Sequence, residues 1–377
     1  MSGMIAGSPR HGGATWAVLQ YLLGLRRLGH EVLFVEQCAE SQLIPTDAEL
    51  VSSENASYFR QVMAGHGFEE RSALLLEGGE ETIGLRYPGL REESRRADVL
   101  LNISGTLTDE RLTAEIPIRV YLDLDPAFNQ LWQESGIDMR FDGHTHFVTV
   151  GQAIGTPDCR VPTCGLAWIP SVPPVVLEHW PAAAEITIDA FTTVGNWRAY
   201  GSIEHDGVFY GQKAHSLREL ITLPTRTDAR FLLALTIHAD EKKDLDALRE
   251  NRWELVDADQ VAGTPADYRK FLAGSRGELG IAKSGYVVSR SGWFSDRSAC
   301  YLASGRPVIA QETGFSRFLP TGEGLFSFET EDGVLEAIEE LQRDYERHVR
   351  AARTLAEEHF DSDRVLTRLL ERLGPES

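Results

Sequence analysis

The sequence has few cysteines, a shortage of basic residues and no long apolar run. Four scattered cysteines in 377 residues cannot form a disulfide framework, which favours a reduced, cytoplasmic setting. The sequence has only 37 basic residues against 57 acidic ones, which gives a formal net charge of −20. This charge weighs against nucleic acid or an anionic membrane as the main partner, because both need basic surface. No segment approaches the roughly 20 apolar residues that span a bilayer, and we expect no signal peptide.

The rest of the composition is typical of a globular α/β protein. Hydrophobic residues make up 42% and charged residues 25% of a chain whose length favours two or three domains. The opening segment predicts a strand at residues 4–7, a glycine-containing loop at 8–13 and a helix at 14–28. Gly29 is expected to end this helix, and residues 31–36 predict the next strand. This order is the elementary unit of a parallel α/β sheet.

The same alternation continues and then restarts after a proline-rich segment. Six of the sixteen prolines lie between residues 157 and 181, which indicates connecting chain between two halves. Before it, strands are predicted at residues 98–103, 119–125 and 146–150, and helices at 55–63 and 69–77. After it, strands are predicted at residues 186–194, 231–237, 253–256, 286–288 and 307–310, and the last helices at 331–360 and 363–373. Two αβα sheets whose strand ends face one cleft would suit a two-part ligand or two substrates.

The strongest chemical signal lies in residues 291–310, which predict a loop, a capped helix, a glycine stop and a buried strand. Free backbone N–H groups and the helix dipole in the first turn favour a phosphate. Asp296 is suited to accept hydrogen bonds from ribose or sugar hydroxyls, and Arg297 to pair with a phosphate. The alternative is that Ser295 and Asp296 only cap the helix.

Several motifs resemble those of GT-B glycosyltransferases. Residues 303–310, followed by residues 312–314, are similar to the family's signature helix and strand, and residues 322–326 to the strand that comes next. The Gly12-Gly13 loop resembles the opening of the first GT-B domain. Residues 356–361 resemble the final helices, which cross back to that domain.

The resemblance implies an α/β protein with two Rossmann-like αβα domains facing across a cleft. Residues 1–180 would bind the acceptor, residues 181–350 the nucleotide sugar, and helices in residues 351–377 would pack on the first domain. It also implies a metal-independent, hexosyltransferase-type enzyme that moves a sugar from a UDP, dTDP or GDP donor to a small-molecule or glycan acceptor, without a cofactor. We expect a cytoplasmic monomer or homodimer that acts in natural-product or cell-envelope glycosylation.

The donor site implied by the resemblance draws on three segments. Arg198 and Lys213 are the expected cations for the diphosphate, although both could be surface cations. The family's helix carries an acid five residues before its glycine, and Cys300 fills that position here, so Asp296 is the candidate replacement. The candidate donor-binding residues are Gly12, Gly13, Gly195, Asn196, Arg198, Lys213, Trp293, Phe294, Ser295, Asp296, Arg297 and Ser298.

The resemblance also implies that His11 is the catalytic base and that Asp123 or Asp125 supports it. The ordinary pKa of histidine lies near neutral pH, which suits removal of the acceptor proton, and a neighbouring acid would orient the ring. The alternatives are an ordinary loop histidine and acids that cap a turn before Pro126. Asp123-Leu124-Asp125 also resembles the metal-binding D-x-D of GT-A glycosyltransferases.

Other enzyme classes remain as alternatives. A dinucleotide could bind the Gly7–Gly13 loop, with Glu36 on its ribose, although a full G-x-G-x-x-G is missing. Such a site would make the protein an NAD-dependent oxidoreductase, and a sugar-nucleotide epimerase, which would bind a nucleotide sugar with no acceptor, is a further alternative. Cys300 in place of the acid keeps a non-catalytic sugar-nucleotide binding protein open. His144 and His146 form either a metal pair or part of the cleft wall.

Overall fold

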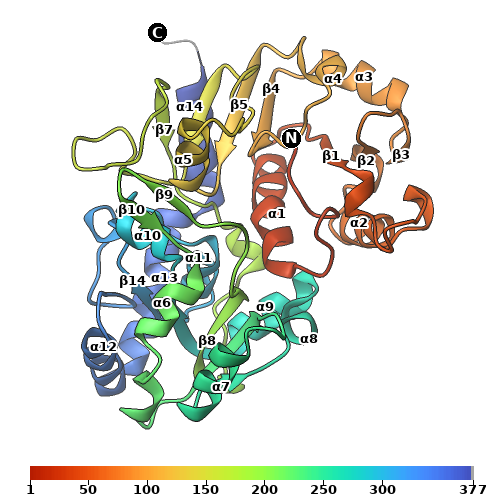
Figure 1. The fold of residues 1–377 in the computed structure, drawn as a ribbon. Helices are drawn as coiled ribbons and strands as arrows, with labels where there is room; N and C mark the ends of the chain where they lie inside the picture. The colour runs from red at the N-terminus through yellow and green to blue at the C-terminus, as the bar shows by residue number, and fades with distance from the viewer. Residues whose placement is uncertain (375–377) are drawn as a thin grey trace.

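The computed structural model describes residues 1–374, which form two α/β halves that lie one above the other in Figure 1. The strands of the first half are β1 (Phe34–Cys38), β2 (Ser72–Leu76), β3 (Thr82–Gly84), β4 (Val99–Ile103), β5 (Ile118–Asp123), β6 (His146–Thr149) and β7 (Trp168–Pro170). Its helices are α1 (Gly12–Arg27), α2 (Glu54–Gly65), α3 (Tyr87–Arg95), α4 (Glu110–Thr113) and α5 (Phe128–Glu134).

The first two residues of the chain join two groups of strands in this half. One group has the order β1-β2-β3 and the other the order β4-β5-β6-β7. Met1 accepts a hydrogen bond from Val35 N at 3.0 Å, while Ser2 N donates to Leu101 O at 2.8 Å and Ser2 pairs in parallel with Asn102. The segment therefore fills the place of a short strand between β1 and β4.

The second half is built on one parallel sheet. Its strands are β8 (Ile188–Asn196), β11 (Phe231–Thr236), β12 (Glu254–Leu255), β13 (Ser275–Gly280), β14 (Val308–Gln311) and β15 (Leu325–Phe328), with a hairpin of β9 (Ile203–His205) and β10 (Val208–Tyr210) beside it. Its helices are α6 (Lys213–Glu219), α7 (Lys242–Glu250), α8 (Ala258–Ala262), α9 (Pro265–Gly274), α10 (Ser284–Ser289), α11 (Asp296–Ala303), α12 (Glu331–Arg343) and α13 (Tyr345–Leu355).

The strand order β12-β11-β8-β13-β14-β15 places β8 and β13 at the centre of this sheet. All five neighbouring pairs are parallel, so every carboxyl end lies at the same edge. Loops that follow parallel strands gather at that edge, which is where open α/β sheets bind ligands.

The last helix, α14 (Ser362–Leu373), returns to the first half and packs on α1, as Figure 1 shows. Gly24 permits the close approach, because a Cβ there would lie 2.5 Å from Cδ1 of Leu366. Arg27 pairs with Asp363 at 3.1 Å beside this contact. The expected crossing of the C-terminal helices is therefore confirmed, whereas the domain boundaries at residues 180 and 350 stay predictions.

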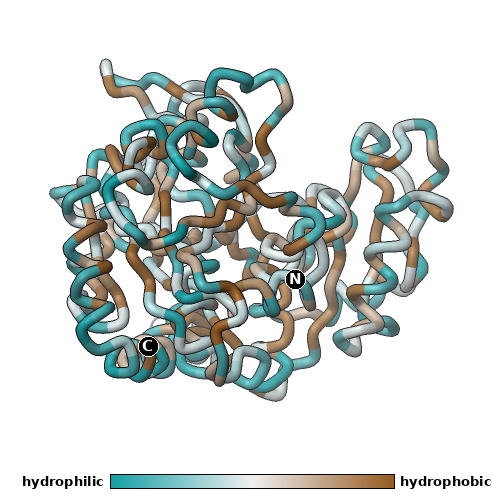
Figure 2. Tube along the Cα trace, turned by 90° about the horizontal axis from the view of Figure 1, so that it is seen from below, coloured by the Kyte–Doolittle hydropathy of each residue, from teal (hydrophilic) through white to brown (hydrophobic). Residues whose placement is uncertain are grey.

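Helix α1 forms as its leucine spacing predicts and lies between the two halves. Its buried side chains include Val18, Leu19 and Leu22, and each stabilises the fold by roughly 1.5–3 kcal/mol through lost contact with water. Gly29 ends it with φ of +88°, a conformation that glycine adopts without strain. In Figure 2 the hydrophobic segments run mainly through the interior and the hydrophilic ones along the rim.

Four sequence-based predictions of secondary structure are wrong. Residues 4–7 are not a strand, because Met1–Ser2 takes the place between the strands. Residues 69–77 contain β2 rather than a helix, and residues 286–288 lie in α10 rather than in a strand. Residues 331–360 are broken at Asp344, between α12 and α13.

Candidate active site between the two halves

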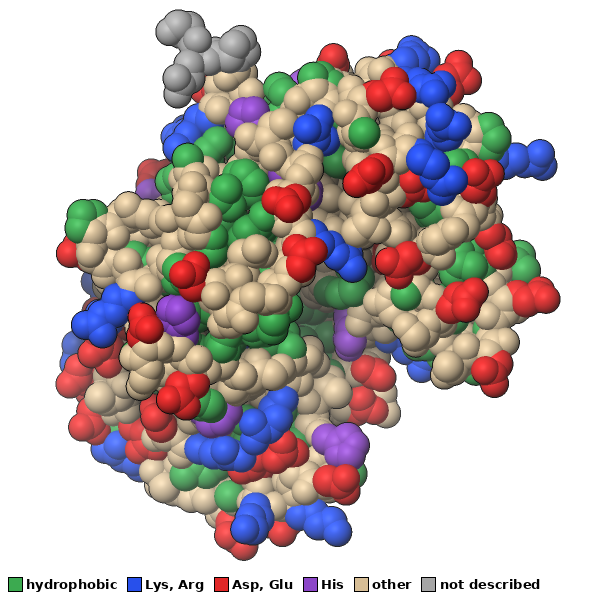
Figure 3. Space-filling view, turned by 45° about the horizontal axis from the view of Figure 1, so that its top comes forward, with side chains coloured by type: hydrophobic (Ala, Val, Ile, Leu, Met, Phe, Trp, Pro, Cys, Tyr) green, Lys and Arg blue, Asp and Glu red, His purple; other side chains and the backbone are tan. Residues whose placement is uncertain are grey.

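The carboxyl edge of the second sheet faces the first half across a hollow that is visible in Figure 3. Contact across it is direct: Ala153 N donates to Ser291 O at 2.8 Å, and Gly151 pairs with Trp293 in an isolated antiparallel bridge. The loops after β6 and α10 therefore meet here. This edge is where the sequence places its donor-binding segments.

A buried charged cluster lies beneath the carboxyl ends of β8 and β13. Arg297 donates through Nε to Glu278 Oε1 at 2.6 Å and through Nη1 to Val194 O at 2.9 Å. Lys213, which is 7% exposed, donates to Ile281 O at 2.6 Å. Arg297 and Lys213 thus stand beside one fully buried carboxylate, and the cluster would carry a net positive charge whenever Lys213 is protonated.

The cluster is electrostatically incomplete. Glu278 Oε2 is buried and has no hydrogen-bond partner among the described residues. Burial lowers the pKa of Lys213 well below its usual value, and the neighbouring Arg297 charge lowers it further. An anion bound beside Lys213 would favour its charged form, so this arrangement suits a phosphate-bearing ligand.

A small hollow, here called the β13–β14 hollow, opens beside this cluster. It is lined by residues 280–282, Trp293, Phe294, Arg297 and Gln311, together with Ser295, Ser298, Ala310 and Phe315. Ser295 caps α11 as predicted, its Oγ accepting from Arg297 N at 3.2 Å. Backbone groups, a helix start and a buried cation therefore surround one space.

Not every predicted donor residue faces that hollow. Gly195 lies beside the cluster, where a Cβ would be 3.6 Å from Lys213 Cε, and its φ of +152° favours glycine. Asn196 is exposed, and Arg198 is exposed and paired with Glu241 at 2.5 Å. Arg297 belongs to the buried cluster, whereas Arg198 does not. Arg297 is therefore better placed than Arg198 to meet a phosphate at this edge of the sheet.

Gly12 and Gly13 have a role in packing between the halves. A Cβ on Gly12 would lie 2.4 Å from Thr264 O, and one on Gly13 would lie 2.9 Å from the Tyr268 ring. Trp16 Nε1 also donates to Pro265 O at 2.8 Å. These glycines therefore allow α1 to approach the backbone of the second half, and they do not line the β13–β14 hollow.

The dinucleotide interpretation of the first loop fails on the same kind of evidence. Glu36 is buried, and its carboxylate accepts hydrogen bonds from the N–H groups of Ile5, Ala6 and Gly7. A ribose would need that carboxylate, and a pyrophosphate would need free N–H groups in the loop. The carboxylate and the N–H group of Gly7 are already used inside the protein.

His11 stands at the N-cap of α1 and does not contact Asp123 or Asp125. Its Nδ1 lies 2.6 Å from Ser8 Oγ. Asp123 is fully buried and accepts from Asn129 at 2.6 Å and from Thr149 and Gln130, so it holds the turn after β5. The expected support of His11 by an aspartate is therefore absent, because these acids already have other partners.

Asp125 belongs to a cross-cleft cluster that the sequence did not reveal. Lys283 Nζ lies 3.1 Å from Asp125 Oδ2, and the hydroxyls of Tyr200 and Tyr286 also donate to this carboxylate. Tyr286 in turn stacks on Trp293 with ring centroids 4.1 Å apart. Asp125 and Lys283 stand 158 positions apart, so only the fold brings them together.

The D-x-D metal interpretation is not supported by this geometry. Burial raises the pKa of Asp123 to about 6, and Asp125 is bound to Lys283. Residues 1–374 contain no cluster of three or more His, Cys, Asp or Glu side chains placed to hold a metal ion. His144 bonds to Asn102 and His146 to Thr145, so these histidines do not form a pair.

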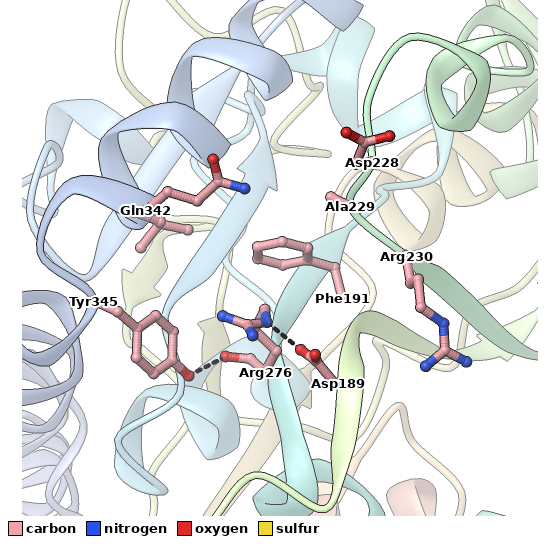
Figure 4. A pocket seen from close by; sticks show the side chains of 9 residues that line it. Asp189, Phe191, Asp228, Ala229, Arg230, Arg276, Gln342 and Tyr345 are labelled. Atoms are coloured by element: carbon pink, nitrogen blue, oxygen red, sulfur yellow. Dashed lines mark hydrogen bonds and ion pairs between the residues drawn. The ribbon is translucent and has the colours of Figure 1, made fainter.

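The open pocket at the opposite edge of the second sheet is a separate feature. Figure 4 shows it lined by Asp189, Arg230, Arg276 and Tyr345, at the amino ends of β8, β11 and β13. Asp189 and Arg276 pair across it at 2.5 Å. It lies away from the first half and from the buried cluster, so it is not part of the candidate site.

Comparison with known proteins now identifies the architecture. Residues 222–371 match a family model described as glycosyl transferase-like. HepE from Anabaena in complex with UDP-glucose superposes with a TM-score of 0.61 at 12% identity, covering 99% of this chain and 98% of that one. The chain has the GT-B fold. A glycosyltransferase from Rickettsia africae ESF-5 has the same GT-B architecture, with a TM-score of 0.53, 10% identity and coverages of 99% and 96%.

The GT-B assignment confirms the resemblance and excludes the GT-A alternative, which has a different fold. No curated protein sequence matches the chain. None of the helices within residues 1–374 has both the length and the apolar character needed to cross a membrane.

Proposed function

We propose that this GT-B protein is a nucleotide-sugar glycosyltransferase that transfers a sugar to the hydroxyl or amine of a small-molecule or glycan acceptor without a required metal. The second half would hold the donor and the first half the acceptor. We propose a UDP sugar as the first donor to test, because HepE, which shares the fold, has been solved with UDP and with UDP-glucose. A cytoplasmic monomer or homodimer remains our expectation.

The observation that carries the proposal is the buried Arg297–Lys213–Glu278 cluster at the carboxyl edge. In sugar transfer the leaving group is a nucleoside diphosphate, whose negative charge grows as the bond to the sugar breaks. Fixed cations in a water-poor site stabilise that charge without rearranging. Here Arg297 and Lys213 would do so, and the backbone at residues 280–282 would line the site.

His11 remains our proposed base. When His11 Nδ1–H donates to Ser8 Oγ, Nε2 keeps its lone pair and is able to accept the acceptor proton. That contact orients the ring, which is the role we had expected of Asp123 or Asp125. An unchanged turnover in His11→Ala would remove His11 from this role.

Thermal unfolding in EDTA with UDP, dTDP, GDP, ADP, NAD and NADP tests the donor site. A ligand at a hundred times its Kd adds about 2.7 kcal/mol of stability. We expect stabilisation by one nucleoside diphosphate without metal. A shift with NAD or NADP alone would favour the oxidoreductase, and a shift that required Mn²⁺ would refute metal independence.

Two variants then assign the binding. Lys213→Met removes one cation while Arg297 still pairs with Glu278, and we expect UDP to bind about 10- to 100-fold more weakly. Arg230→Met is the matched control, since Arg230 lies at the other edge of the sheet and pairs with Glu254. Equal UDP affinity in Lys213→Met and the control would contradict the assignment. UDP binding without sugar release or transfer would indicate a non-catalytic binding protein.

A further inference from the structure

A second hollow, here called the α1 hollow, lies next to the β13–β14 hollow. Both hollows include Trp293 and Phe294 in their walls. The α1 hollow adds side chains from the first half and the connecting segment, namely Ala17, Tyr21, Leu124, Val150, Pro173 and Pro174. It therefore adjoins the proposed donor site and is walled mainly by the half that would hold the acceptor.

The α1 hollow contains a buried polar group without a partner. Tyr21 is 2% exposed, and its hydroxyl makes no hydrogen bond within the described chain. Such a group costs free energy in the unliganded protein, because it has lost water and gained no partner. A ligand that hydrogen-bonds to Tyr21 would remove that cost.

Asp296 is the second polar group of this hollow. Its carboxylate takes no hydrogen bond from another side chain in residues 1–374, and it lies close enough to raise the pKa of Tyr21 further, beyond the effect of burial. Gln20 also lines the hollow, but its amide is already used by Val176 N and by Cys300 Sγ. The Tyr21 hydroxyl, which has no partner, and the Asp296 carboxylate, which has only backbone partners, thus line the same hollow.

This geometry changes two expectations about the donor site. Asp296 lines the α1 hollow and not the β13–β14 hollow, so it does not replace the family's ribose-binding acid. Cys300 is buried and receives a hydrogen bond from Gln20 Nε2 at 3.6 Å, so it faces α1. The acid missing at position 300 is therefore not restored one helical turn earlier.

We propose that the α1 hollow binds the acceptor and that Tyr21 and Asp296 hold one of its hydroxyl groups. Tyr21 would donate to that hydroxyl oxygen, and the hydroxyl would donate to the Asp296 carboxylate. A sugar acceptor would need a polar partner for each of several hydroxyls, whereas the remaining wall is largely apolar. The acceptor is therefore a largely apolar molecule that has a hydroxyl group for Tyr21 and Asp296 in addition to the group that receives the sugar. This inference rests on the proposed function for the meaning of "acceptor", but the binding site itself does not require turnover.

The test uses three ring compounds of graded polarity as probes: phenol, toluene and myo-inositol. Affinities would be measured by ligand-observed saturation-transfer NMR titration, with and without saturating UDP. We expect phenol to bind at least tenfold more tightly than toluene, and myo-inositol to bind more weakly than phenol. Stronger binding of myo-inositol, or equal binding of phenol and toluene, would overturn the proposal.

Tyr21→Phe isolates the hydroxyl contact. This change removes only an unpartnered oxygen, so the protein should fold, and the preference for phenol over toluene should fall about tenfold. Asp296→Asn should reduce the same preference. Tyr121→Phe is the matched control, because its hydroxyl is also buried and unpartnered but does not line the hollow. An unchanged preference in Tyr21→Phe would refute the inference.

The two proposals fail separately. If UDP does not stabilise the protein but the phenol preference depends on Tyr21, the donor assignment is wrong and the hydroxyl site stands. If UDP binds through Lys213 and the preference for phenol over toluene does not depend on Tyr21, the donor site stands and the acceptor assignment is wrong.

Discussion

Replacing Glu36 with Gln should change how the stability of the protein depends on pH. Glu36 is 1% exposed, and its carboxylate accepts hydrogen bonds from Ile5 N at 3.0 Å, Ala6 N at 2.9 Å and Gly7 N at 2.7 Å. This single side chain fixes the turn that leads into the loop of His11. Gln keeps the shape but removes the titration.

The magnitude follows from the two protonation equilibria. Burial raises the pKa of Glu36 to about 7, from an ordinary value of 4.5. Between these values the folded state binds more protons than the unfolded state, so the stabilising contribution falls as pH rises. The full difference is about 3 kcal/mol, and about 2 kcal/mol of it should be lost between roughly pH 5.5 and 8.5.

Other buried groups titrate in the same range and would obscure this slope in the wild type. The pKa of Asp123 is raised by burial to about 6, and burial lowers that of the Met1 ammonium to about 5. The Met1 term has the opposite sign, because stability is lost as pH falls. The quantity to measure is therefore the difference in free energy of unfolding between wild type and Glu36→Gln.

Urea unfolding at about pH 5.5, 7 and 8.5 gives this difference, with the linear dependence on urea checked at each pH. It should decrease by about 2 kcal/mol from the lowest to the highest pH. The Gln amide would face Ala6 N with a second donor, which adds a constant penalty but no pH dependence. Glu40→Gln, at an exposed site, serves as the control. A difference that is flat with pH would refute the reasoning.

Three further changes test the packing of the site. Gly12→Ala should destabilise the protein by about 1–3 kcal/mol, because the new Cβ would lie 2.4 Å from Thr264 O; unaltered urea unfolding would contradict the tight contact between the halves. Arg297→Met should cost about 3–5 kcal/mol by leaving Glu278 buried without its hydrogen-bonded ion-pair partner, and adding Glu278→Gln should recover part of it. Tyr21→Phe should raise the melting temperature, since it removes an unsatisfied buried hydroxyl; a lower value would imply a partner for that oxygen.

Local signals in the sequence were sufficient to predict the boundaries of helices that begin or end with a characteristic residue. Gly29 ends α1 and Ser295 caps α11 as predicted, because each conformation is decided within one turn of chain. The GT-B architecture could also be predicted, since the final helix, the connecting segment and the signature around Gly305 lie in sequence order.

The central strand β13 could not be found from its composition. Its residues, Ser275 to Gly280, include an arginine, two glycines and Glu278, which do not resemble a buried strand. Glu278 can be buried in this strand because it pairs with Arg297 from α11. Residues 69–77 were wrongly predicted as a helix because their local pattern favours one. Pairing with β1 makes residues 72–76 a strand instead.

The predicted roles of site residues were wrong where a residue's partners lie far away along the chain. Asp125 was linked to His11 because both belong to the first half, yet it pairs with Lys283 from the second. Asp296 was assigned to the donor because it lies one helical turn before Cys300, yet it lines the α1 hollow.

These corrections share one physical cause, which is the close contact between the halves along α1. Gly12 lies against the backbone of the second half, and Cys300 lies against Gln20 of α1. Positions that the family's pattern would place around a nucleotide are instead used for packing. The space left for ligands comprises two hollows that share Trp293 and Phe294, one lined by Arg297 and the other by Tyr21 and Asp296. An arrangement of this kind would keep an anionic donor and an apolar acceptor apart while holding both beside the same loop.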